Sequence, residues 1–217
     1  MDFATARKIM VNSQIRPNDV TDPDIVRAFQ TVPREAFVSP SKQSIAYSEF
    51  EISTGEGRAM WIPMDLAKMV KALDPKPRDI ALVIGAGSGY SSALLAELTE
   101  TVLAVEDSAD AVARLTDRMV ALGYDQVAAI EAPLKEGLPA QGPFDIILIN
   151  GMVEHVPEAL TAQLADGGRL GAVVKLDDAL GRGRIWERSA DTVSFRDVFD
   201  ARPPEFTAFQ KPKTFRF

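Results

Sequence analysis

Three glycines at alternate positions, Gly85, Gly87 and Gly89, follow an apolar run and precede a segment with helical periodicity over 91–98. Glycine tolerates positive φ angles and lets the backbone come close to a ligand. The helix that follows directs the free N–H groups of its first turn at the same place. This arrangement predicts a loop that binds a nucleotide-like cofactor. The competing interpretation, a tight turn between strand and helix, leaves the three glycines unexplained.

Position 90 separates the cofactor classes. The dinucleotide fingerprint G-x-G-x-x-G requires a glycine there, and this chain has Tyr90. The observed spacing, G-x-G-x-G, is the one usual in S-adenosylmethionine sites. Glu106 ends the next apolar run, about 20 residues beyond the loop, where an acidic side chain accepts hydrogen bonds from ribose hydroxyls. The sequence therefore predicts an S-adenosylmethionine site.

Alternating apolar and helical patterns predict the elements that position this site. Strands are expected at 80–84, 102–105, 127–130, 144–149 and 169–174, and helices at 91–98, 108–122 and 156–164. Such alternation predicts an α/β fold with a Rossmann-like, doubly wound and mostly parallel sheet. Two further strands, near 184–188 and 193–200, follow with short connections, so the sheet is expected to finish with an antiparallel edge. That ending favours a methyltransferase over a dehydrogenase.

The remaining segments flank this domain, which is expected to span 78–201. The pattern over residues 1–77 predicts a helical N-terminal cap, which includes the segment expected to lie on the substrate side. Its helices are expected over 4–15, after a cap at Thr21 or Asp22, and after Pro63, with an irregular stretch at 39–60. Residues 202–217 form an aromatic and basic tail, which indicates docking on a surface. The residues behind that prediction are Phe206, Phe209, Phe215, Phe217, Arg202, Lys211, Lys213 and Arg216.

Composition limits the partners. The 217 residues carry a net charge of −7, which disfavours nucleic acids and anionic membranes as partners, although a local basic patch is compatible with it. The absence of cysteine and the single histidine, His155, predict no metal site. His155 is interpreted as a helix cap or surface residue, with general-base work as the alternative. Without a signal peptide or a long apolar run, the chain is expected to be cytoplasmic.

Several motifs together resemble the protein L-isoaspartate O-methyltransferase family over roughly residues 5–175. The resemblance implies that the cofactor is S-adenosylmethionine. It also implies that the substrate is a protein or peptide with an exposed carboxylate, on a damaged aspartyl residue. It does not define the oligomeric state. The matching motifs are Val32-Pro33-Arg34, Phe37-Val38, Ala46-Tyr47, the block from Ile84 to Tyr90, Val105-Glu106, Gly137-Leu138-Pro139, Pro143-Phe144-Asp145, Val156-Pro157 and Gly167-Gly168-Arg169-Leu170.

Three positions depart from the family pattern. Trp61 stands where the family has a serine or threonine whose hydroxyl lies beside the reacting carboxylate. Val83 replaces a glutamate near the methionine part of the cofactor. Ala132-Pro133-Leu134 replaces a Gly-Asp-Gly whose aspartate faces the adenine. Trp61 is therefore interpreted either as filling a gap in the core or as an aromatic side chain that plugs or lines the acceptor pocket.

The predicted site combines the motif residues with one residue at the end of the fourth strand. Asn150 with Gly151 is interpreted as a ligand group at the sheet edge or as a turn. Three functions remain open: protein carboxyl methylation, cofactor binding without transfer, and methylation of a different acceptor. Trp61 is assigned to the acceptor pocket. The residues predicted to bind the cofactor are Ile84, Gly85, Ala86, Gly87, Ser88, Gly89, Tyr90, Glu106, Asp107, Pro133, Leu134 and Asn150.

Overall fold

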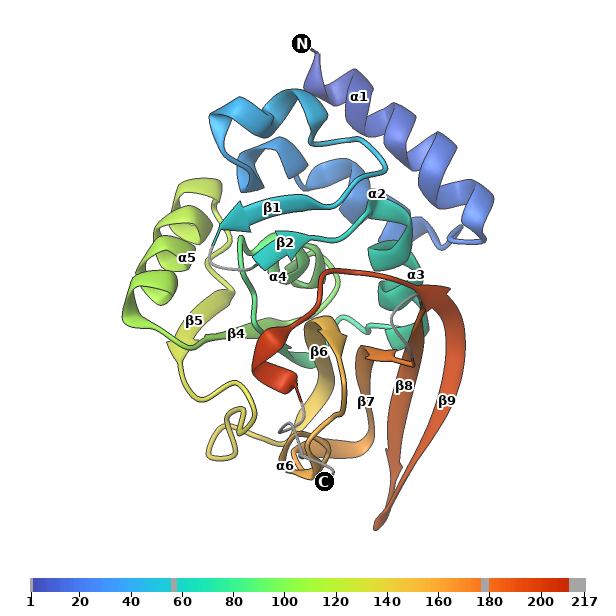
Figure 1. Cartoon of the computed structure of the whole chain (residues 1–217), viewed down its shortest axis with the longest axis vertical. Coiled ribbons are helices and arrows are strands. Elements are labelled where there is room, and N and C mark those ends of the chain that lie inside the picture. The colour runs from blue at the N-terminus through green and yellow to red at the C-terminus, as the bar shows by residue number, and fades with distance from the viewer. Residues whose placement is uncertain (1, 56–57, 177–179, 211–217) are drawn as a thin grey trace, which may run out of the picture.

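A seven-stranded sheet forms the centre of the chain in a computed structural model, which describes residues 2–55, 58–176 and 180–210. The strand order is β5-β4-β3-β6-β7-β8-β9, parallel from β5 to β7 and antiparallel across β8 and β9. The mostly parallel sheet with an antiparallel edge is thus confirmed (Figure 1). The strands are β3 (Ile80–Ile84), β4 (Thr101–Glu106), β5 (Val127–Glu131), β6 (Phe144–Val153), β7 (Leu164–Lys175), β8 (Gly181–Ser189) and β9 (Thr192–Ala201).

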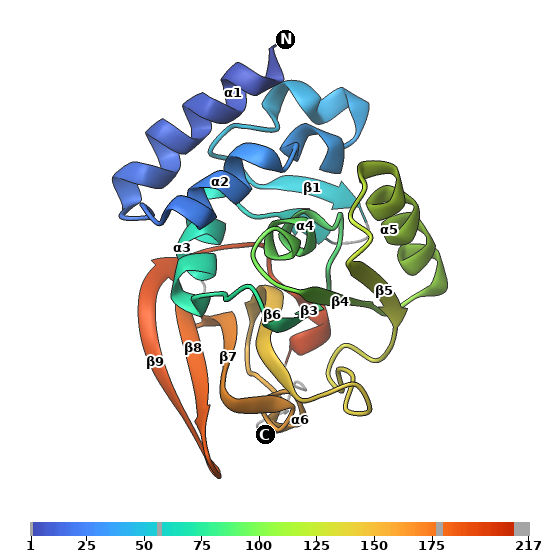
Figure 2. The ribbon, with the colours of Figure 1, turned by 180° about the vertical axis from the view of Figure 1, so that it is seen from behind.

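Strand β3 is buried on both faces, as its continuous apolar run requires. Ala81 and Val83 belong to one hydrophobic cluster, whereas Leu82 and Ile84 belong to the other. The first cluster lies under helices α3 (Pro63–Leu73), α4 (Tyr90–Ala96) and α5 (Ala109–Leu122), seen in front of the sheet in Figure 2. The second lies under α6 (Glu158–Thr161) and the tail turn η5 (Thr207–Phe209), which Figure 1 shows on the opposite face.

The N-terminal segment forms a cap above the carboxyl ends of the central strands (Figure 1). Asp22 caps α2, as one of the two predicted caps, by accepting hydrogen bonds from the backbone N–H groups of Asp24 and Ile25. The stretch expected to be irregular contains a short antiparallel hairpin. The cap elements are α1 (Phe3–Met10), η1 (Val11–Ile15), η2 (Arg16–Asn18), α2 (Pro23–Thr31), η3 (Arg34–Phe37), η4 (Pro40–Ile45), β1 (Ile52–Gly55) and β2 (Arg58–Met60).

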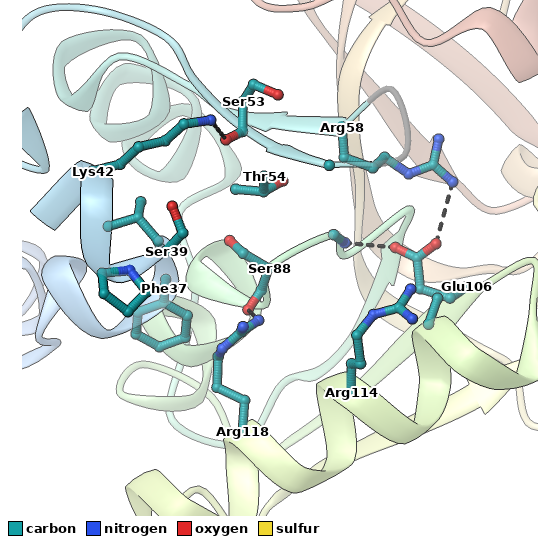
Figure 3. A pocket seen from close by; sticks show the side chains of 15 residues that line it. Phe37, Ser39, Lys42, Ser53, Thr54, Arg58, Ser88, Glu106, Arg114 and Arg118 are labelled. Carbon is teal, nitrogen blue, oxygen red and sulfur yellow. Dashed lines mark hydrogen bonds and ion pairs between the residues drawn. The ribbon is translucent and has the colours of Figure 1, made fainter.

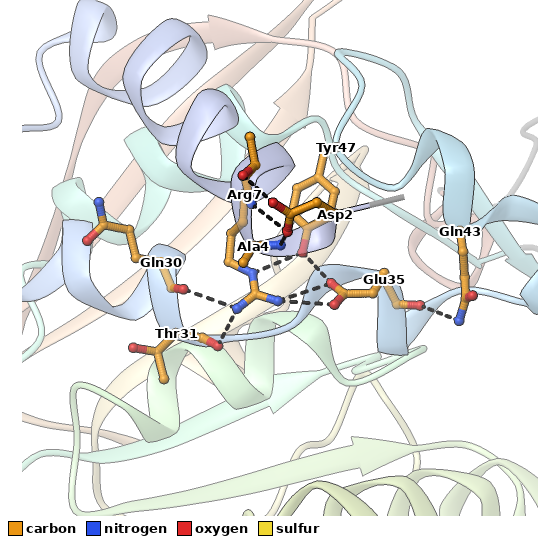
Figure 4. Close-up of polar contacts among 9 residues, drawn as sticks. Asp2, Ala4, Arg7, Gln30, Thr31, Glu35, Gln43 and Tyr47 are labelled. Atoms are coloured by element: carbon orange, nitrogen blue, oxygen red, sulfur yellow. Dashed lines mark hydrogen bonds and ion pairs between the residues drawn. The ribbon is translucent and has the colours of Figure 1, made fainter.

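One polar network ties the parts of the cap together (Figure 4). Arg7 of α1 donates to the carbonyl oxygens of Gln30 and Thr31 at the end of α2, and pairs with Glu35 at 3.1 Å. Its Nε also donates to the hydroxyl of Tyr47, which in turn donates to Glu35. Burial and the neighbouring Glu35 carboxylate raise the pKa of Tyr47, so this hydroxyl keeps its proton. The network fixes the segment that leads into the hairpin.

Two predicted boundaries were wrong. Strand β6 continues through Asn150 to Val153, with an irregular register between Leu148 and Met152, so Asn150-Gly151 lies within the strand and is not a turn after it. The expected helix at 156–164 is reduced to α6, because β7 already begins at Leu164, where it pairs with Phe144. Short apolar runs fit helix and strand equally well, and here sheet pairing decides between them.

Stability is expected to depend on pH through Asp65, in the first turn of α3. Burial raises its pKa to about 6, although Lys68 and the backbone N–H of Arg202 act in the opposite direction. The folded state therefore holds this proton more tightly than the unfolded chain, and the free energy of unfolding falls as the pH rises through about 4 to 6. Asp65→Asn is expected to remove this loss and to raise stability at pH 8 by about 1 kcal/mol.

Urea unfolding of both proteins between pH 4 and pH 8 measures this effect. Asp110→Asn, in the exposed first turn of α5, is the control for a generic loss of charge. An unchanged pH slope in Asp65→Asn would show that another group is responsible.

Candidate cofactor site

The glycine loop connects β3 to α4 at the carboxyl edge of the sheet. Its glycines all have positive φ angles: 69° at Gly85, 60° at Gly87 and 89° at Gly89. At Gly89 a Cβ atom would lie 2.5 Å from Cδ1 of Leu115, so the end of this side chain in α5 packs closely against the loop. The N–H of Gly85 donates to the carbonyl of Val105 at 2.9 Å and joins the loop to the end of β4. The strand, the glycine loop and the helix therefore follow one another in the predicted order.

Glu106 ends β4 beside this loop, and only 2% of it is exposed. One carboxylate oxygen accepts from the backbone N–H of Gly87 at 2.5 Å. The other pairs with the guanidinium of Arg58, from β2, at 3.2 Å. Asp107 is exposed and lies 3.5 Å from the same guanidinium. Glu106 stands where a ribose acceptor is expected, and two partners from this chain already engage it.

Asn150 holds the glycine loop from the side of β6. Its Nδ2 donates to the carbonyl of Gly85 at 3.0 Å, and its Oδ1 accepts from the hydroxyl of Ser91 at 3.0 Å. In this structure the amide therefore fixes the loop against the start of α4. Its position brings it to the same edge as Glu106, although both ends of its side chain are used internally.

Phe206 of the tail also lies on the glycine loop. A Cβ atom added at Gly85 would collide with the ring carbons Cζ and Cε1 of Phe206. The guanidinium of Arg58 lies over the same ring, with its Cζ 4.3 Å from the ring centroid. The tail aromatics were expected to dock on a surface, and Phe206 and Phe209 are indeed buried. The tail residues from Lys211 onward lie outside the described part of the chain.

Residues 132–134, which replace the motif that faces the adenine in the family pattern, differ in how far they are buried. Leu134 is buried in the second hydrophobic cluster, which also contains Phe206, whereas Pro133 is exposed. The N–H of Ala132 donates to the carbonyl of Glu106 at 3.0 Å, which keeps this segment next to the end of β4. An apolar wall and backbone groups are therefore present, and Pro133 has no N–H to offer.

Trp61 is 1% exposed and belongs to the first hydrophobic cluster. The fully buried Arg34 donates to its carbonyl at 2.6 Å and also lies over the ring of Tyr90 at 4.7 Å. Trp61 borders a cavity of only about 10 Å³, which Asn150 and Ser91 also line. The indole therefore packs in the core and leaves almost no open space beside it, and its place in an acceptor pocket stays a prediction.

A larger pocket of about 460 Å³ lies beside Glu106 and the residues Gly87 and Ser88 of the glycine loop (Figure 3). Lys42, Arg58, Arg114 and Arg118 line it, and among the described lining residues Glu106 is the one with an acidic side chain. Burial, together with the charge of Arg114, lowers the pKa of Arg118. The pocket is thus a local basic site in a protein with a net charge of −7. Its chemistry suits anionic groups that approach the glycine loop.

The donor and acceptor set fits S-adenosylmethionine, but the ring of Phe206 fills the space next to Gly85. The positive-φ loop, the buried carboxylate of Glu106 and the apolar Leu134 are the features such a cofactor needs. Neither Arg58 nor Phe206 is predicted from the sequence to lie at this site. For Phe206 the signal was the density of aromatic residues in the tail. Arg58 had no comparable signal, since it is one of 24 lysines and arginines.

Curated relatives match most of the chain. Protein-L-isoaspartate O-methyltransferase 1 of Rhodopseudomonas palustris (strain HaA2) is 33% identical over 201 residues, which are 92% of this chain and 82% of that protein. Protein-L-isoaspartate O-methyltransferase of Roseiflexus castenholzii (strain DSM 13941 / HLO8) is 36% identical over 202 residues, which are 93% of this chain and 92% of that protein.

Solved structures agree on the fold. A protein-L-isoaspartate O-methyltransferase superposes with a TM-score of 0.80 at 21% identity; the match covers 93% of this chain and 65% of that one. The PCMT of Plasmodium falciparum, in complex with S-adenosyl-L-homocysteine, superposes with a TM-score of 0.77 at 19% identity and covers 94% of this chain and 98% of that one. Residues 5–198 match the sequence model of Protein-L-isoaspartate(D-aspartate) O-methyltransferase (PCMT). The chain belongs to this family of S-adenosylmethionine-dependent methyltransferases.

Proposed function

We propose that this protein transfers the methyl group of S-adenosylmethionine to the carboxylate of isoaspartyl residues in proteins or peptides. One observation carries the proposal: in a chain of this family, Glu106 and the glycine loop meet at the carboxyl edge of a parallel sheet, joined by the hydrogen bond from Gly87. Ligands of open α/β sheets bind at this edge. The net charge of −7 supports a protein substrate over a nucleic acid.

Each site residue has a role in this proposal. The loop from Gly85 to Gly89 gives the cofactor a close backbone approach, Glu106 accepts hydrogen bonds from its ribose, and Leu134 supplies an apolar wall for its adenine. Asn150 positions the loop through the carbonyl of Gly85. The sulfonium of the bound cofactor supplies the reactive methyl group. A carboxylate acceptor needs no strong base, so the protein chiefly has to align the reactants and exclude water.

A substrate panel with radiolabelled S-adenosylmethionine tests the proposal. Label is expected to enter an isoaspartyl peptide and to remain absent from the matched aspartyl peptide. Label that enters only another class of acceptor would replace the proposed substrate. Cofactor binding without transfer to any acceptor would identify a binding protein, an alternative for which the nearly closed cavity at Trp61 is the structural support.

A further inference from the structure

We propose that Arg58 and Phe206 occupy the space between Gly85 and Glu106, here called the cofactor crevice. S-adenosylmethionine then binds only when these two side chains leave it. The two residues then set the affinity for the cofactor. The proposal rests on the proposed function, because it takes the crevice between Gly85 and Glu106 to be the cofactor site.

Phe206 fills the space that the glycine loop keeps free of side chains. Its ring carbons lie where a Cβ atom of Gly85 would be, and a Cβ atom at Gly151 would lie 3.0 Å from the Cβ of Phe206. Glycines in a cofactor loop normally allow the ligand this close approach. Here a buried aromatic ring makes the approach instead, since only 4% of Phe206 is exposed.

Arg58 engages the group expected to hold the ribose. Its guanidinium lies 3.2 Å from Glu106 Oε2 and 4.3 Å from the centroid of the Phe206 ring, so it bridges the two. The exposed fraction of its side chain is 16%, and that of Glu106 is 3%. A charge-assisted pair with so little solvent access is screened weakly. Ribose hydroxyls therefore have to compete with a cation for the same carboxylate.

The tail is held in this position by contacts of its own. The N–H of Met152 donates to the carbonyl of Pro204 at 2.9 Å, and the N–H of Phe206 donates to the carbonyl of Met152 at 2.7 Å. Glu205 pairs with Lys175 of β7 at 2.8 Å. The ring of Phe209 lies 5.0 Å from that of Phe206, between centroids. Docking of the tail along β6 is thus what brings Phe206 onto the loop.

When the tail and the cofactor compete for the crevice, the apparent affinity for the cofactor is the affinity of the open form multiplied by the fraction of molecules whose crevice is open. Removing the buried ring of Phe206, which competes with the cofactor, is expected to tighten cofactor binding by roughly 10- to 100-fold. Phe206→Ala makes this change. Arg58→Met is the second variant, because it keeps the apolar stem over the ring but leaves Glu106 without its cation. It is expected to tighten binding by about 3- to 10-fold.

Two measurements test the proposal without any turnover. Calorimetric titration with S-adenosyl-L-homocysteine gives the affinity of the wild type, Phe206→Ala and Arg58→Met. Hydrogen exchange of the wild type reports the Phe206 N–H, which is expected to lose protection when S-adenosyl-L-homocysteine saturates the protein. Phe144→Ala is the matched control, because it removes a buried ring from the same hydrophobic cluster at the start of β6, whereas the tail meets this strand near its other end. Its affinity is expected to stay within about threefold of the wild type.

The outcomes separate this proposal from the proposed function. Tighter binding in Phe206→Ala than in Phe144→Ala, with loss of tail protection in the wild type, supports the competition. Equal affinities in all variants, or cofactor binding that leaves the tail protected, overturn the competition but leave the cofactor site intact. An equal gain in Phe144→Ala overturns the assignment to Phe206. Absence of binding in every variant overturns both the competition and the cofactor site.

Discussion

Trp61→Ser is expected to methylate an isoaspartyl peptide about 10²- to 10³-fold faster than the wild type at saturating cofactor. In the family pattern this position carries a hydroxyl beside the reacting carboxylate. An indole cannot take that role here, because Trp61 is buried and borders a cavity of only about 10 Å³. A serine both restores the hydroxyl and vacates the volume of the indole next to Asn150 and Ser91.

The same change is expected to lower the free energy of unfolding by about 3–5 kcal/mol, since it removes a large aromatic side chain from a packed cluster. Initial rates with labelled S-adenosylmethionine and urea unfolding measure the two effects. Trp61→Phe is the control: it keeps a ring but supplies no hydroxyl, so its rate should equal that of the wild type. Robust wild-type turnover that falls in Trp61→Ser would instead make the indole part of the active site.

Much of the fold around the glycine loop could be predicted, because it depends on residues that are close together in the sequence. The apolar run before Gly85, the glycine spacing and the position of Glu106 at the end of the next strand are local features. Parallel pairing of β3 with β4 then brings the loop and the carboxylate together. The hydrogen bond from Gly87 to Glu106 spans only 19 positions and follows from that single crossover.

The occupants of the crevice could not be predicted in this way. Arg58 reaches Glu106 across 48 positions, and Phe206 meets Gly85 only because the tail pairs with β6 after the whole sheet is complete. Periodicity carries no information about such contacts. The aromatic density of the tail indicated docking but not where. Asn150 shows the same limit, since its place inside β6 depends on an irregular register that no local pattern encodes.

The distribution of charge over the molecule also could not be predicted from the composition. The chain is acidic overall, yet Lys42, Arg58, Arg114 and Arg118 converge on one pocket beside the glycine loop (Figure 3). Arg58 belongs both to this pocket and to the crevice. The electrostatic surroundings of Glu106 therefore decide how well it serves as an acceptor.

Glu106→Ala is expected to weaken binding of S-adenosyl-L-homocysteine by about 10- to 100-fold, because hydrogen bonds to a charged acceptor contribute roughly 1.5 to 3 kcal/mol. The change also leaves the Gly87 N–H without its acceptor and Arg58 without its nearer carboxylate. A loss of stability of about 1–3 kcal/mol should accompany it. Calorimetry in both the wild type and the Phe206→Ala background measures the affinity, since competition from the tail is removed in the latter.

Asp107→Ala is the matched comparison for this experiment, and it also tests the prediction from the sequence that Asp107 binds the cofactor. Asp107 is the next residue along the chain, carries the same charge and lies 3.5 Å from the same guanidinium, but 53% of its side chain is exposed and no hydrogen bond to the glycine loop is found for it among the described residues. Its removal should change the affinity by less than about threefold, as expected for an exposed charge. If the two variants lose affinity equally, the effect is one of net charge near Arg58. If neither loses affinity in the Phe206→Ala background, Glu106 is a structural partner of Gly87 and Arg58, and the ribose acceptor lies elsewhere.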